Sequence, residues 1–191
     1  MSGRMRRMLL ALILLAGCAA PPAALPRAPA PLAPIVLATV EIVGQAPAGL
    51  REQLLTAYRR WPQAHGGVSR IELCAKLMRR GAELAGMYNN RTRVLTLALD
   101  SPQKYVVETL YHELGHAIWN DHFVSFERRW WAERYERVKR LDGEVPSKYA
   151  TKTAREFFAE HIAMRSVAAD AHARVFPIEN HEMTLQGIEP R

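Results

Sequence analysis

The chain has 191 residues, a formal net charge of +7, and hydrophobic residues at 49 % of its positions. Three of its arginines lie in residues 1–17, which contain no acidic residue, so the remainder carries a charge of +4. So weak a charge, without a motif of interleaved basic and aromatic residues, is not typical of nucleic-acid-binding proteins. We therefore expect no nucleic-acid partner.

Residues 1–17 have the composition of a secretory signal. Three arginines precede the apolar run MLLALILLAG, which is too short to span a bilayer as a permanent helix. The sequence LAGC, which ends at Cys18, resembles the lipobox of bacterial lipoproteins. That resemblance implies cleavage before Cys18 and lipid attachment to it. Because Ala19 and not aspartate follows, it also implies sorting to the outer membrane. The alternative is a plain signal peptide or apolar anchor with an incidental cysteine.

A proline-rich segment follows the cysteine. Residues 21–34 hold six of the twelve prolines in the chain. Because proline fixes φ and removes a donor, residues 18–34 are predicted to form an extended tether to the membrane. Residues 35–191 are long enough for one domain with its own core. With Cys18 lipidated, Cys74 has no disulfide partner, and its strand-like context predicts a buried small side chain.

The first half of the domain alternates strand and helix patterns. The β-branched segment 35–43 predicts a buried strand, and residues 47–61 predict an amphipathic helix. The apolar residues of that helix recur at helical spacing: Leu50, Leu54, Leu55, Tyr58 and Trp61. Further strands are expected at about 68–74, at 83–88 and, after the turn NNRT, at 94–99. Helices follow these strands, which is typical of an α+β domain with a mixed sheet.

The second half of the domain predicts three helices. The first has Ser101 as its N-cap and Pro102 as its first helical residue. Its buried face is expected to be a stripe of four residues: Val107, Leu110, Leu114 and Ile118. The second covers about 123–140, with Trp131, Tyr135 and Val138 buried and the opposite face in solvent. A lid or a membrane-facing helix is the alternative for this segment. The third begins near Thr153.

The motif HELGH lies within the first of these helices. His112 and His116 are four residues apart, so both imidazoles can point toward one metal ion. Glu113 would lie near the open coordination position, where a carboxylate can take a proton from water. Gly115 leaves space for a neighbouring strand or a ligand. The alternative is a chance match on a solvated helix, although the apolar stripe argues against it.

A catalytic zinc usually takes a third protein ligand. His122 has the spacing of the HExxHxxGxxH pattern, but Trp119 replaces the glycine that lets the chain turn back. Glu156, in the run EFFAE, is the better candidate. A capping box with Thr153 would compete for the same carboxylate. Glu160, one turn later, is expected to orient a ligand histidine and not to bind the metal.

The HExxH motif, the EFFAE run and Tyr149 seven residues before Glu156 together resemble the catalytic domain of the anthrax lethal factor family of gluzincin metallopeptidases. The resemblance covers Tyr111 to His161, and Thr153 stands where that family often has asparagine. It implies a small zincin-like domain and a zinc ion bound by His112, His116 and Glu156. Glu113 would be the general base, and Tyr149 would stabilise the oxyanion.

These observations predict a zinc-dependent peptidase, most simply an endopeptidase, that acts on peptides or proteins in the bacterial cell envelope. The alternative is a zinc-binding lipoprotein of the envelope that is non-catalytic or latent. For Tyr149, the alternative is a loop tyrosine packed on the core. We assign no function to His161, His172 or His181.

Overall fold

The structure, a computed structural model, describes residues 40–190. The predicted signal segment 1–17, the lipidation site Cys18 and the tether 18–34 lie outside the described residues and stay predictions. Within residues 40–190, no helix has the length and hydrophobicity required to cross a bilayer.

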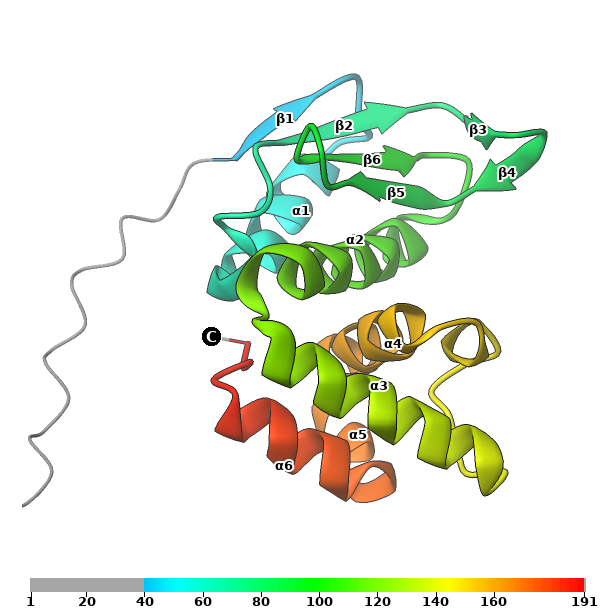
Figure 1. Cartoon of the computed structure of the whole chain (residues 1–191). Helices are drawn as coiled ribbons and strands as arrows, with labels where there is room; N and C mark the ends of the chain where they lie inside the picture. The colour runs from blue at the N-terminus through cyan, green and yellow to red at the C-terminus, as the bar shows by residue number, and fades with distance from the viewer. Residues whose placement is uncertain (1–39, 191) are drawn as a thin grey trace, which may run out of the picture. The chain divides into compact units, whose positions relative to one another are not determined.

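Short strands form a mixed sheet with an adjoining hairpin (Figure 1). The strands are β1 (Glu41–Val43), β2 (Arg70–Cys74), β3 (Leu77–Arg79), β4 (Ala82–Leu84), β5 (Gly86–Asn89) and β6 (Val94–Ala98). The sheet order is β1-β2-β6-β5, with β1, β2 and β6 mutually parallel and β5 antiparallel to β6. Strand β5 is therefore an edge strand, whereas β3 and β4 pair only with each other in the described part of the chain.

Helices make up most of the remaining domain, which agrees with the predicted α+β class. They are α1 (Leu50–Arg59), α2 (Gln103–Ala117), α3 (Ser125–Arg140), α4 (Ala154–Val167), α5 (Ala169–Val175) and α6 (Pro177–Leu185). Helix α2 contacts β5 and β6 on one side and α4 on the other, so it forms a middle layer (Figure 1). Helices α3 and α5 both pack against α4.

The close contact of α2 with α4 depends on Gly115. A Cβ atom at this position would lie 2.7 Å from the Cα of Ala159, which is closer than real Cβ contacts allow. The neighbour for which Gly115 leaves space is therefore a helix and not the strand or ligand expected from the sequence. Aromatic side chains of α3 and α4 fill the core beneath this contact, with Trp131, Phe157 and Phe158 fully buried.

The predicted strands are confirmed at 68–74 and 94–99, but two other predictions need correction. Residues 35–39 of the strand predicted at 35–43 lie outside the described residues, and β1 covers Glu41–Val43. It is not a buried strand as predicted, because Glu41 and Val43 share a face that is exposed. The strand predicted at 83–88 is two strands, β4 and β5, interrupted at Ala85. The turn of the β3–β4 hairpin consists of Arg80 and Gly81, both with positive φ. The sequence did not predict this hairpin, because the recognisable signal for such a turn is asparagine-glycine.

The predicted helices are confirmed, with differences at their ends. Ser101 is not the N-cap of α2, because Pro102 has an extended ψ of 144° and precedes the first helical residue, Gln103. Val106 is buried in α2, whereas Val107 is only half-buried. The predicted buried stripe of α3 is confirmed. Cys74 is half-buried at the end of β2, and not fully buried as predicted.

Candidate metal centre

A cleft of about 670 Å³ lies between the edge strand β5 and the N-terminal half of α4, with α2 as its floor. Its wall also includes Tyr149, which begins the short 3₁₀ turn η3 (Tyr149–Thr151). The HELGH segment of α2 lines the base of this cleft. Segments that are distant in sequence are thus brought together around His112 and His116.

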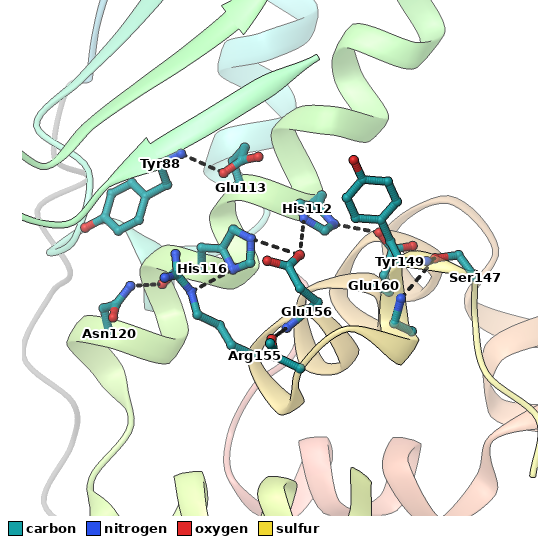
Figure 2. A network of polar contacts seen from close by, with 12 residues as sticks. Tyr88, His112, Glu113, His116, Asn120, Ser147, Tyr149, Arg155, Glu156 and Glu160 are labelled. Carbon is teal, nitrogen blue, oxygen red and sulfur yellow. Dashed lines mark hydrogen bonds and ion pairs between the residues drawn. The ribbon is translucent and has the colours of Figure 1, made fainter. Parts of the chain in front are cut away.

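Three predicted ligand atoms converge at the base of the cleft (Figure 2). The Oε2 atom of Glu156 lies 3.1 Å from Nε2 of His112 and 3.4 Å from Nε2 of His116. The two imidazole rings are nearly perpendicular, with centroids 4.8 Å apart. The sequence prediction that Glu156 approaches both histidines agrees with this geometry.

The local structure at the start of α4 explains how Glu156 reaches the histidines. Thr153 is the N-cap, and its Oγ1 accepts a hydrogen bond of 3.1 Å from the backbone N–H of Glu156. The Glu156 side chain does not complete the capping box but lies against the imidazoles. Because α4 approaches α2 closely at Gly115, a side chain as short as glutamate spans the distance between the helices.

The donor set fits a zinc ion. Zinc bound tetrahedrally at 2.0–2.1 Å places its ligand atoms about 3.3 Å apart, close to the two distances from Glu156. Glu113 also has an oxygen within 4.8 Å of the imidazole nitrogens. However, its Oε2 accepts a hydrogen bond of 2.7 Å from the backbone N–H of Tyr88. Glu156 is therefore the better third ligand, and Glu113 lies beside the ligand set.

The carboxylates favour a positive charge at the base of the cleft. Glu160 lies 2.7 Å from Nδ1 of His112, on the ring edge opposite Glu156. Burial alone would lower the pKa of His112, but the hydrogen bonds with Glu156 and Glu160 outweigh it and raise that pKa to about 10. Burial opposes ionisation of Glu156 and Glu160, but their hydrogen bonds with His112 lower both pKa values below the ordinary range. A proton on His112 thus occupies the place of a cation in the metal-free protein.

Glu113 is buried between the helix and the edge strand. Burial raises the pKa of its carboxyl, although the neighbouring imidazoles and the Tyr88 N–H act in the opposite direction. Strand β5 comes this close because residue 86 is glycine: a Cβ atom there would lie 2.5 Å from Cγ2 of Thr109 and 3.2 Å from Cγ of Glu113. A buried carboxylate with a raised pKa in a cleft has the properties of a general base.

Tyr149 stands on the rim of the cleft with 51 % of its surface exposed. Its ring centroid is 6.4 Å from that of His112 (Figure 2), and its backbone N–H donates to Oγ of Ser147 at 3.0 Å. The Nζ of Lys152 lies 3.3 Å from the centre of its ring. Tyr149 is therefore a cleft residue and not a tyrosine packed on the core.

With the geometry of the site established, the chain can be compared with known proteins. Neither protein-family models, nor curated proteins, nor solved structures give any match to it. The assignment of the site therefore depends on its geometry and chemistry and on the resemblance noted in its sequence.

The other histidines are outside the cleft. His122 is exposed at the end of η2 (Ile118–His122), one turn of π-helix that follows α2. His161 and His172 are fully buried on the far side of α4, and His181 is exposed. No function was assigned to the last three from the sequence, and none of the four contributes to the cleft wall.

Two residues that contact the site, Tyr88 and Arg155, were not predicted from the sequence. Tyr88 acts through its backbone N–H, which no side-chain pattern reveals. Arg155 directs its Nε–H to Nδ1 of His116 at 3.0 Å. Its position next to Glu156 was the only available signal, because His116 lies 39 residues earlier in the chain.

Proposed function

We propose that this chain is a small zincin-like peptidase of the gluzincin type, similar to the anthrax lethal factor family, that hydrolyses peptide bonds with a bound zinc ion. The observation that carries the proposal is the convergence of His112, His116 and Glu156 on one point, with Glu113 beside them. The cleft at this point is open enough to admit a peptide.

In this proposal His112 and His116 hold the zinc through Nε2, and Glu156 holds it through Oε2. The bound zinc would polarise the scissile carbonyl and lower the pKa of water at the site. Glu160 would orient His112 through its contact with Nδ1, which is the usual role of a carboxylate behind a ligand histidine. The Thr153 cap and the Gly115 contact would keep Glu156 in place.

Glu113 would accept the proton of the attacking water and pass it to the leaving amine. Its raised pKa suits both transfers, because a base that is too weak cannot take the proton and one that is too strong cannot return it. The Tyr88 N–H fixes one carboxylate oxygen and leaves the other for this exchange. The Tyr149 hydroxyl, on the rim beside His112, would donate a hydrogen bond to the developing oxyanion.

A peptide substrate would lie along β5. This strand is at the edge of the sheet and lines the cleft. Its outer backbone groups, apart from the Tyr88 N–H that donates to Glu113, can pair with an extended peptide. Such pairing recognises backbone and not side chains. We therefore propose an endopeptidase whose sequence preference comes from the cleft walls.

We further propose that the enzyme works in the bacterial cell envelope. The lipobox at Cys18 would anchor it to the outer membrane, and residues 18–34 would separate the domain from the lipid. The substrate would then be a peptide or protein of the same compartment.

Cleavage of a mixed peptide library by the purified chain tests the proposal. The decisive variant is Glu113→Gln, compared with wild type at equal zinc content. We expect zinc-dependent cleavage that falls by about 10² to 10⁴-fold in the variant, the usual contribution of a general base. Glu108→Gln is the matched control, because Glu108 lines the cleft on the same helix and, among the described residues, makes no hydrogen bond or ion pair with the ligands. If zinc binds and no peptide is cut, the chain is a zinc-binding lipoprotein, non-catalytic or latent.

A further inference from the structure

The two ligand histidines differ in what contacts their outer ring nitrogens. Nδ1 of His112 lies 2.7 Å from a carboxylate oxygen of Glu160, whereas Nδ1 of His116 receives the Nε–H of Arg155 at 3.0 Å (Figure 2). A carboxylate can only accept a hydrogen from a ring N–H, and a guanidinium can only donate one. Nδ1 of His112 is therefore held as a hydrogen-bond donor, whereas Nδ1 of His116 is held as an acceptor.

The Arg155 contact determines where the proton of a neutral His116 ring lies. Because Nδ1 accepts from Arg155, Nδ1 carries no hydrogen, and the proton lies on Nε2. In this tautomer the Nε2–H faces Oε2 of Glu156 at 3.4 Å. The asparagine beside this histidine does not alter the choice, because Nδ2 of Asn120 donates to the backbone oxygen of His116 and not to its ring.

This is the wrong tautomer for a metal ligand at Nε2. A metal at Nε2 needs the lone pair of that nitrogen, so the ring proton must move to Nδ1. Nδ1 then becomes a donor and faces another donor, the Nε–H of Arg155. Metal binding and the Arg155 contact are therefore mutually exclusive. No proton is gained or lost by the ring, because the proton only changes nitrogen.

We infer that Arg155 is a positioning residue that holds His116 in the tautomer unable to bind metal and so sets the metal affinity of the site. The inference rests on the proposed function, because it assigns His116 as a ligand through Nε2. Metal entry requires the Arg155 side chain to leave the ring. Arg155 is half-buried in the cleft wall, so the open cleft gives its side chain room to move.

The expected change in zinc affinity follows from the contacts that ligand histidines usually make through their outer ring nitrogen. Partners that accept from the outer N–H of a ligand histidine typically strengthen metal affinity by 10 to 100-fold. His112 has such an acceptor in Glu160, whereas Nδ1 of His116 faces a donor, the Nε–H of Arg155. Replacing Arg155 by methionine removes the donor and keeps an unbranched side chain on the wall. We expect Arg155→Met to tighten zinc binding on the order of tenfold.

The first measurement is the tautomer of His116 in the metal-free protein. Ring ¹⁵N shifts of the histidine-labelled purified chain separate N–H from bare nitrogens, and His116→Gln identifies the relevant signals. We expect the Nε2–H form in wild type and a shift toward Nδ1–H in Arg155→Met. Arg155→Lys, which still donates, should largely restore the wild-type signal. Arg79→Met is the matched control, since Arg79 lines the cleft but contacts Met87 instead of a histidine.

The second measurement is zinc affinity by chelator competition for wild type, Arg155→Met, Arg155→Lys and Arg79→Met. Tighter binding in Arg155→Met, with Arg155→Lys and Arg79→Met near wild type, supports the inference. A wild-type His116 already in the Nδ1–H form, or unchanged or weaker zinc binding in Arg155→Met, overturns it. If no variant binds zinc, the proposed function fails, and the tautomer measurement still decides the role of Arg155 in the metal-free protein.

Discussion

Two pairs of histidines lie on opposite sides of α4 and have almost the same ring geometry. His112 and His116 have centroids 4.8 Å apart at 88°, and His161 and His172 have centroids 5.1 Å apart at 89°. The first pair faces carboxylates at the base of a cleft. The second pair is fully buried, and its nitrogens Nδ1 of His161 and Nε2 of His172 are 2.9 Å apart.

Surroundings, and not ring geometry, decide what each pair can do. The hydrogen bonds to Glu156 and Glu160 overcome burial and raise the pKa of His112 to about 10, so that site favours a cation. Burial lowers the pKa of His172 to about 4 and lowers that of His161 as well. Trp131, Phe157 and Phe176 surround His161. The second pair is therefore a neutral part of the core, and it shares one hydrogen bond.

The largest effect is expected when the carboxylates that contact the first histidine pair are neutralised one at a time. Glu156→Gln replaces the charged carboxylate of a proposed ligand by a neutral amide of the same shape, and we expect zinc affinity to fall by more than about 100-fold. Glu160→Gln keeps all three ligands, so its loss should be about 10 to 100-fold. Chelator competition measures both variants.

Glu108→Gln is the control for these two variants, because Glu108 contributes charge to the cleft and, among the described residues, makes no hydrogen bond or ion pair with a histidine. Its zinc affinity should be close to that of wild type. Equal losses in all three variants would mean that only the total negative charge of the cleft matters, and Glu156 would lose its assignment as a ligand.

A second test increases the distance between α2 and α4, the two helices that carry the proposed ligands. In Gly115→Ala the added Cβ meets the Cα of Ala159, a backbone atom that cannot move without shifting α4. We expect the free energy of unfolding to fall by about 1–3 kcal/mol, which is typical of overpacking. Zinc affinity should fall by about tenfold, because Glu156 moves away from both histidines. Ala163→Val, on α4 at the cleft wall, is a control that lies away from this contact. Unchanged zinc affinity in Gly115→Ala would contradict the structural role given to this glycine.

Much of the first pair's surroundings could be predicted from the sequence. The four-residue spacing of His112 and His116 predicted a shared face of a helix. The run EFFAE predicted Glu156 as the third residue of the site. These predictions depend on local periodicity and on the resemblance of short motifs. The helical positions of Trp131, Tyr135 and Val138 were predictable for the same reason.

The contacts that hold the site together were not predictable. The Tyr88 N–H on Glu113 and the Arg155 N–H on His116 join segments 25 and 39 residues apart, and neither involves a recognisable pattern. The second histidine pair was hidden as well, because α5 follows α4 after a single non-helical residue and gives no periodic signal over so short a length. Long-range packing, which a single sequence does not encode visibly, decided these contacts.

The opposite pKa shifts of His112 and His172 affect the stability of the metal-free protein on opposite sides of neutral pH. The raised pKa of His112 stabilises the fold fully below its ordinary value of 6.5, and this contribution is lost as pH rises toward about 10. The lowered pKa of His172 acts on the other side, because the unfolded chain binds a proton below 6.5 that the folded protein takes up only near 4. The combined contribution of these two histidines should therefore be greatest near pH 6.5.

Denaturant unfolding of the chelator-treated protein at several pH values tests this maximum. Glu160→Gln sharpens the test, because it removes one of the two carboxylates that raise the pKa of His112 through a hydrogen bond. Its stability should decline less between pH 6.5 and 10 and also less in acid, because the lowered pKa of Glu160 contributes to the acid decline of the wild type. A wild-type protein whose stability keeps rising above pH 8 would disprove the assignment of the alkaline decline to His112.

The smallest effect on zinc is expected from the second pair. In His161→Leu the Nε2 atom of His172 loses its buried partner, and an unpaired buried polar group costs about 1–3 kcal/mol of stability. His161→Leu combined with His172→Leu removes both partners, and such a change can be nearly neutral. The double variant should therefore be more stable than the single variant. It should also lose part of its decline in acid, because neither side chain can then take up a proton. Zinc affinity should stay within about twofold of wild type in both, since Glu156 and Glu160 contact His112 and not this pair. A large loss of zinc binding in the double variant would mean that the two histidine pairs are coupled through α4 and do not act as separate regions.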